Sequence, residues 1–366
     1  MDLLLAHSAK FNHIVFDADR YSPLPSPQER IQFLVSVQLP VIDSYRSRIT
    51  SALDAFESIS FAFVRAVPGA LSIGLPGRPD ASVNVNAQNL TTGIEGVQRL
   101  CKALLSASYI HASLEAWSED VLFLELWQDI LREPLLREQA QLCTLLPRIG
   151  TPRADGEVGN EMIFGEMLLR YSAIITRAED MMVQQVCGEI EAGLRPHFIA
   201  SSNNAKKSLE VGVSQTLLSP VALLVSQLSY LRQTLPLLTF TALYRRIASR
   251  LSEHILQRQI LYRGSFSKEE GIIIQAECEL WVESCHSALG GALGGGRNRV
   301  TAPWAKLLQA GRIVGADGEV WERITSATFG MSGEEDWENA MQETTGLAEL
   351  GRQEVTQLLR RREDSS

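Results

Sequence analysis

The sequence is poor in cysteine and has no long apolar run, and each deficit excludes a class of protein. Five cysteines occur in 366 residues, an odd number that does not suit a framework of disulfides. No apolar stretch approaches the roughly 18 residues that a membrane-spanning helix needs, and the first residues lack the basic region of a secretory signal. We therefore expect a cytoplasmic protein with reduced thiols that meets a membrane only through partners. The thiols are those of Cys101, Cys143, Cys187, Cys278 and Cys285.

Clusters of basic residues are also missing, which argues against nucleic acid as a ligand. The formal net charge is −9, and the segment from Asp317 to Ser366 holds twelve acidic residues against five arginines. Nucleic-acid phosphates require clustered lysine and arginine. The acidic C-terminal segment suits a basic protein partner instead, although a solvated helix face that keeps the protein soluble explains the same residues.

Motifs for catalysis and for cofactors are weak. The glycine-rich stretch 290–299 lacks the Gly-Lys-Ser/Thr ending of a phosphate-binding loop, so we interpret it as a flexible link. The acidic run 334–338 has the carboxylate density of a magnesium-diphosphate site, as in all-helical terpene synthases, but acids in a first helical turn also offset the helix dipole. We expect no enzyme, no metal and no cofactor. An all-α magnesium-dependent enzyme is the alternative.

Local signals for helices run through the whole chain. Four capping boxes, each a serine or threonine with glutamate three residues later, precede segments with the helical apolar period. After the first box, a stripe containing Val37, Val41, Tyr45, Ile49 and Phe56 predicts one long buried face, which Pro40 should kink. The fold class we expect is all-α. The boxes are Ser26/Glu29, Thr92/Glu95, Ser267/Glu270 and Ser332/Glu335.

Three breaks rich in glycine and proline divide these helices. They predict a helical bundle over residues 1–150 with a long loop at 68–89, a second bundle over 151–264, and an acidic C-terminal bundle over 265–366.

Two segments carry a more specific pattern. The first segment runs from Leu100 to Leu126 and extends to Trp127, and the residues of its stripe recur at helical spacing. This pattern predicts one continuous helix with a buried stripe, in which Asp120 is a polar anchor. The second segment starts at 260 with Ile-Leu-Tyr-Arg. The stripe comprises Tyr109, Ser113, Ala116, Trp117, Asp120, Phe123, Leu124 and Trp127, and the second segment continues with Phe266, Ser267, Glu270, Gly271 and Gln275.

Both segments resemble the RINT/Tip family, the subunits of the Dsl-type complex that tethers Golgi-derived vesicles at the endoplasmic reticulum. The resemblance implies an elongated stack of helical bundles, as in the exocyst, COG, GARP and Dsl tethers, with no catalytic activity. It also implies a peripheral location at the endoplasmic reticulum membrane. The residues that it marks as a structural motif are Tyr109, Trp117, Asp120, Phe123, Phe266, Gly271 and Gln275.

The resemblance implies two kinds of partner. SNARE proteins of the endoplasmic reticulum would bind the C-terminal part, and other tether subunits would bind an N-terminal helical segment that this sequence lacks. Trp304 and Trp321 are the candidate anchors for a SNARE if their indoles are exposed, and burial in the core is the alternative. A generic helical scaffold is the remaining interpretation.

Overall fold

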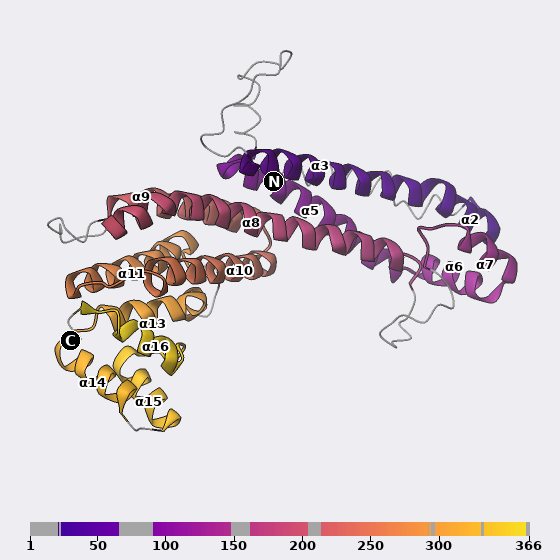
Figure 1. The fold of residues 1–366 in the computed structure, drawn as a ribbon. Helices are drawn as coiled ribbons and strands as arrows, with labels where there is room; N and C mark the ends of the chain where they lie inside the picture. Colours follow the sequence, from indigo (N-terminus) through magenta and orange to yellow (C-terminus); the bar gives the residue numbers. More distant parts are fainter. Residues whose placement is uncertain are drawn as a thin grey trace, which may run out of the picture. The chain divides into compact units, whose positions relative to one another are not determined.

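The structure is a computed structural model that describes residue 21 and residues 23–65, 91–147, 162–203, 214–291, 293, 297–330 and 333–363 (Figure 1). These residues form helices and no strand, with an isolated backbone bridge between Phe266 and Arg362. The predicted all-α fold is confirmed. Among the described residues, no helix is both long and apolar enough to cross a membrane.

Contacts between residues group the chain into two compact units. Unit 1 comprises Met1–Thr91 and Gln98–Met182, and unit 2 comprises Thr92–Val97 and Val183–Ser366. The finer division into three bundles stays a prediction. The expected loop at 68–89 lies outside the described residues, as does Ser332. The predicted box Ser332/Glu335 is wrong, because the helix Glu334–Thr345 has Gly333 as its N-cap and no side-chain cap.

Unit 1 is built from long helices, α3, α5 and α8, and several shorter ones. Residues 98–118 of α5 and 165–182 of α8 belong to it, and the remainder of these two helices belongs to unit 2. Its elements are α2 (Pro27–Phe33), the π-helix η2 (Leu34–Gln38), α3 (Leu39–Arg65), α5 (Gly93–Ser118), α6 (Val121–Arg132), α7 (Pro134–Gln141) and α8 (Gly165–Asn203).

The predicted helix starts are largely found. Helix α2 has the complete capping box, because the Glu29 N–H donates to the Ser26 hydroxyl at 3.3 Å and the Glu29 carboxylate accepts from the Ser26 N–H at 3.4 Å. Helix α5 begins directly after Thr92. These bonds join residues three apart, so the local sequence is enough to specify them.

The buried stripe predicted after Ser26 is wrong in its first half. Val37 is 45% exposed and Tyr45 is 39% exposed, whereas Leu34 and Ile42 are fully buried. The π-helix η2 interrupts the α-helical turn in this stretch, because the Leu39 N–H donates to the Leu34 carbonyl five residues back. It lies directly before Pro40, which has no N–H to donate and whose ring crowds the preceding turn.

Unit 2 is centred on one helix, α11, which packs mainly against α9 and α13 (Figure 1). Its largest core side chains are tryptophans: Trp281 of α11 stacks on Trp304 with ring centroids 6.2 Å apart, and both are fully buried. Besides residues 183–203 of α8, its elements are α9 (Gln215–Thr234), α10 (Leu237–Ile255), the π-helix η3 (Leu256–Leu261), α11 (Lys268–Leu289), α12 (Arg297–Thr301), the 3-10 helix η4 (Ala302–Trp304), α13 (Ala305–Val314), α14 (Gly318–Phe329), α15 (Glu334–Thr345) and α16 (Arg352–Leu359).

Candidate functional site

Asp120 lies at a break between two helices, and not inside one. Helix α5 ends at Ser118, and Asp120 is the N-cap of α6, where its carboxylate accepts from the Leu122 N–H at 2.9 Å. The side chain is exposed. The predictions of one continuous helix and of a buried Asp120 are therefore wrong. An aspartate at the N-cap satisfies a free backbone N–H and faces the positive end of the helix dipole, so burial is unnecessary.

The aromatic residues of the same motif form part of the core of unit 1. Phe123 is 5% exposed and packs edge-on against Phe164 at a centroid distance of 4.9 Å and against Tyr21 at 5.5 Å. Trp117 is half-buried and meets the same Phe164 ring at 6.3 Å. Tyr109 is also half-buried. The motif thus joins the end of α5 and the start of α6 to the start of α8.

In unit 2 the motif residue Gly271 marks a close approach of two helices. A Cβ atom added there would lie 2.1 Å from the carbonyl oxygen of Val314 in α13, so no side chain fits. The close approach of α11 and α13 extends along both helices. A Cβ atom added to Gly315 would lie 2.8 Å from the Cβ of Gln275, and one added to Gly311 would lie 3.1 Å from the side chain of Cys278. Glycine permits this backbone approach.

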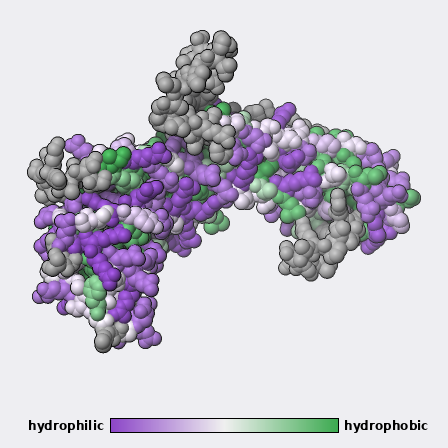
Figure 2. Space-filling model, viewed as in Figure 1, coloured by the Kyte–Doolittle hydropathy of each residue, from purple (hydrophilic) through white to green (hydrophobic). Residues whose placement is uncertain are grey.

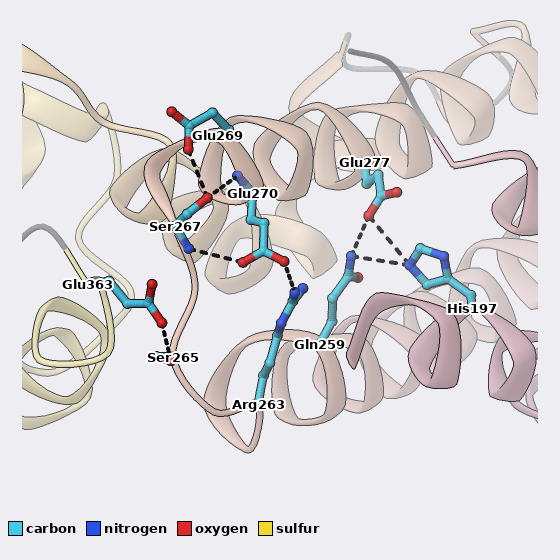
Figure 3. A network of polar contacts seen from close by, with 9 residues as sticks. All are labelled: His197, Gln259, Arg263, Ser265, Ser267, Glu269, Glu270, Glu277 and Glu363. Carbon is cyan, nitrogen blue, oxygen red and sulfur yellow. Dashed lines mark hydrogen bonds and ion pairs between the residues drawn. The ribbon is translucent and has the colours of Figure 1, made fainter. Parts of the chain in front are cut away.

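The residues around the start of α11 form a polar network at the surface of unit 2 (Figure 3). Ser267 caps the helix, since the Glu270 N–H donates to its hydroxyl at 3.3 Å and its own N–H donates to the Glu270 carboxylate at 3.0 Å. The same carboxylate pairs with Arg263, and the Ser265 hydroxyl donates to Glu363 at 2.6 Å. These contacts fix the turn that leads into α11.

Phe266 ties this turn to the C-terminal residues. Its side chain is 1% exposed, its N–H donates to the Arg361 carbonyl at 3.1 Å, and its carbonyl accepts from the Glu363 N–H at 3.2 Å. Arg362, between these two residues, is itself buried and donates to the carbonyl of Ala316. The motif residue therefore anchors the end of the described chain to the core.

The two tryptophans proposed as partner anchors differ in exposure. Trp304 is fully buried, stacks on Trp281 and donates its indole N–H to the Tyr244 hydroxyl at 3.2 Å, so its proposed role as an exposed anchor is wrong. An apolar ring with one satisfied donor is well suited to a core. Trp321 is half-buried, and the Arg362 guanidinium lies 4.1 Å above its ring.

A buried polar cluster that was not predicted from the sequence joins α8, η3 and α11 of unit 2 (Figure 3). His197 of α8, Gln259 of η3 and Glu277 of α11 are 1–2% exposed. One carboxylate oxygen of Glu277 accepts from the Gln259 amide and lies 3.4 Å from His197 Nε2, and the other accepts from the Ser214 N–H at 3.3 Å. The only available signal was a glutamate on the buried face of α11.

The order of groups in this cluster has a chemical counterpart in hydrolases. His197 Nδ1 lies 3.0 Å from the Thr216 hydroxyl, so a hydroxyl, an imidazole and a carboxylate follow one another. A triad needs an oxyanion site and room for substrate beside the hydroxyl. Here the imidazole is enclosed, and its contacts, with those of Gln259, satisfy polar groups in the core. The geometry supports a structural role.

Two open grooves lie on unit 2. One of about 410 Å³ contains Asp317 and Val320 from the start of α14 and faces the end of α15. The other, of about 320 Å³, lies between α10 and the segment α12–η4. No group of three or more potential metal ligands occurs among the described residues. The first groove is lined by Gln275, Arg312, Ala316, Asp317, Val320, Thr344, Thr345 and Gly346.

Comparison with known families gives one match that covers nearly the whole chain. Residues 16–362 match the RINT-1/TIP-1 family. Both motif segments fall within this range. Comparisons with curated proteins and with solved structures found no match. The all-α fold, the structural placement of the motif residues and the extent of the match agree: the chain belongs to the RINT-1/TIP-1 family, the non-enzymatic tether subunits of Golgi-to-ER retrograde transport.

Proposed function

We propose that this chain binds the helical N-terminal region of a SNARE of the endoplasmic reticulum through its acidic C-terminal segment, residues 317–363. Membership in a tethering complex follows from the family, whereas the SNARE, the surface and the peripheral location at that membrane are our proposal. The observation that carries it is the direction in which the charged side chains of this segment point.

The acidic side chains of the segment face solvent, whereas several of its basic ones are bound to the protein. Arg362 is buried, Arg352 donates to the Thr328 carbonyl at 3.0 Å, and Arg361 donates to the Ile260 carbonyl at 3.3 Å. Hydrophilic residues cover most of the visible face over α14 and α15 (Figure 2). The exposed acids are Asp317, Glu319, Glu322, Glu334, Glu335, Asp336, Glu338, Glu343, Glu349 and Glu363.

The groove beside α14 supplies the apolar part of such a site. Val320 is 43% exposed and lines the groove together with Asp317. An acidic surface steers a basic helix toward its site and makes association depend on salt, while burial of an apolar side chain contributes to the lifetime of the complex. Helix docking in a groove is a common mode of peptide recognition. In this proposal Val320 takes the place of Trp304.

Point variants test the surface better than a deletion. A truncation starting at Trp304 would remove a core tryptophan that stacks on Trp281, so a loss of binding would not separate recognition from unfolding. We would measure binding of the purified chain to the cytoplasmic regions of endoplasmic reticulum SNAREs. The variants are Glu319→Lys with Glu322→Lys, and separately Val320→Ala.

The charge variant should weaken binding at low ionic strength, and the difference from the unsubstituted chain should shrink as salt screens it. Val320→Ala should weaken binding at every salt concentration. The matched control is Glu125→Lys with Glu138→Lys, two exposed acids of unit 1 whose replacement changes the charge equally. If both test variants bind like the control, the SNARE site lies elsewhere.

A further inference from the structure

The second groove of unit 2 has the opposite charge and, we propose, is a second docking site that takes a peptide segment of a protein partner bearing carboxylates next to a large apolar side chain. This groove lies between α10 and the segment α12–η4 and has a volume of about 320 Å³. It is lined by Arg245, Ser249, Asn298, Arg299, Ala302 and Pro303.

The walls of the groove are two basic segments of an acidic protein. Residues 237–250 contain three arginines and residues 297–306 contain two arginines and a lysine, with no acidic residue in either segment, although the net charge of the chain is −9. Arg250 pairs with Glu191 and Arg297 pairs with Glu283. By contrast, Arg245 and Arg299, which line the groove, form no ion pair with a described residue.

The two walls are held together by a buried polar chain. The Tyr244 hydroxyl donates to the Val300 carbonyl at 2.7 Å and accepts from the Trp304 indole N–H at 3.2 Å. Burial raises the pKa of Tyr244, so the hydroxyl stays neutral and keeps both bonds. Arg245 follows Tyr244 directly and Arg299 precedes Val300. The two guanidinium-bearing positions are therefore fixed before a ligand arrives, which lowers the entropic cost of binding.

An exposed apolar side chain, Leu238, lies on the face of α10 that carries Arg245 and Ser249. Leu238 is 86% exposed, and it precedes Arg245 by seven residues and Ser249 by eleven, which are about two and three helical turns. The backbone rise between Leu238 and Arg245 is about 10 Å. A ligand that places a large apolar side chain about 10 Å from a pair of carboxylates would contact Leu238 and the two arginines at the same time.

The chemistry favours a peptide over a membrane surface. Guanidinium groups match carboxylates with two parallel hydrogen bonds, and the Ser249 hydroxyl and Asn298 amide add donors for a discrete anionic group. Adsorption to an anionic membrane uses clusters of about four to eight basic residues close to one another. Of the basic residues in the two walls, Arg250 and Arg297 pair with glutamates, and Arg245 and Arg299 line the concave groove. The Arg299 guanidinium also donates to the Leu293 carbonyl at 3.1 Å, which holds it in place.

Fluorescence anisotropy with the full chain tests the proposal. The probe is a fluorescein-labelled peptide of repeated Leu-Glu-Glu-Leu units, and the comparison probe carries glutamine in place of glutamate. Arg245→Glu with Arg299→Glu should weaken binding of the acidic peptide by about tenfold at low salt, because exposed charge pairs each contribute up to about 1 kcal/mol and reversal turns attraction into repulsion. Leu238→Ser should weaken it as well.

The matched control reverses two exposed arginines outside the groove, Arg195→Glu with Arg258→Glu. Equal loss of binding in the control and test variants, or equal binding of the glutamine peptide, would overturn the proposal. So would binding to vesicles of equal parts phosphatidylcholine and phosphatidylserine without binding of the acidic peptide. The variant Arg245→Glu with Arg299→Glu should retain SNARE binding, so the proposals for the two grooves can be refuted independently.

Discussion

Gly271→Ala tests the tightest helix contact in the structure. Two effects oppose one another at this position. Alanine is a better helix former than glycine by about 0.5–1 kcal/mol. The new Cβ, however, would lie 2.1 Å from the Val314 carbonyl oxygen, whereas a carbon and an oxygen in ordinary contact are separated by about 3.3 Å. Helices α11 and α13 would therefore have to separate by about 1 Å along this contact.

The cost of that separation exceeds the gain in helix propensity. Overpacking a core costs about 1–3 kcal/mol, and more when the obstacle is backbone, which cannot change rotamer. We expect Gly271→Ala to destabilise unit 2 by about 1–3 kcal/mol net, which corresponds to a lower Tm by about 2–4 °C per kcal/mol for a unit of this size. Gly188→Ala is the matched control, because Gly188 lies inside α8 and an added Cβ there has nothing within 4 Å.

Differential scanning calorimetry of the full chain measures both variants on the same transition, since both positions belong to unit 2. Gly188→Ala should raise the Tm and Gly271→Ala should lower it. If Gly271→Ala leaves the Tm unchanged or raises it as the control does, α11 and α13 are not packed as closely as the structure has them, and the explanation of this motif residue fails.

Three further predictions concern side chains with defined environments. Asp120→Ala should destabilise unit 1 by about 1 kcal/mol in a denaturant titration and Asp120→Asn by much less, since both Asp and Asn cap helices; equal losses would contradict a capping role. At mildly alkaline pH, dithionitrobenzoate should label Cys143 first, because the other four thiols are buried and burial raises the pKa of Cys101, for example, to about 12; uniform labelling would count against this. Burial also lowers the pKa of His254, so between the folded pKa and the ordinary value of 6.5 the unfolded state binds more protons than the folded state. The free energy of unfolding should therefore fall as the pH drops through that window. His254→Gln should make this fall less steep, and an unchanged slope would exclude His254 as its source.

The presence of helices and several of their starts could be predicted because the signals are local. The boxes at Ser26 and Ser267 join groups three residues apart, and both are complete in the structure. The acidic character of the C-terminal segment was equally available from the residue count. The two motif segments, around Trp117 and around Phe266, together suggested the family.

The buried faces of helices could not be predicted as reliably. Helical periodicity assumes an unbroken turn of constant width, and two local events violate it. A π-helix that contains the exposed Val37 interrupts the regular turn before Pro40, and the cap at Asp120 ends one helix and starts another. The second event had a readable signal, an aspartate directly before an apolar run.

The sequence by itself therefore determined the helical class, the capped starts, the uneven charge and the family. Only the tertiary structure decided which side chains meet. Gly271 is needed because the backbone of Val314, from another helix, lies against it, and His197 finds its partner Glu277 on a distant helix. Likewise Arg245 and Arg299, 54 residues apart, line one groove where Tyr244 donates to the carbonyl of Val300. The physical reason is the sequence separation of the interacting residues. Helix capping and helix propensity act over a few residues, whereas packing, burial and the placement of charged side chains in one groove depend on contacts between elements far apart in the chain.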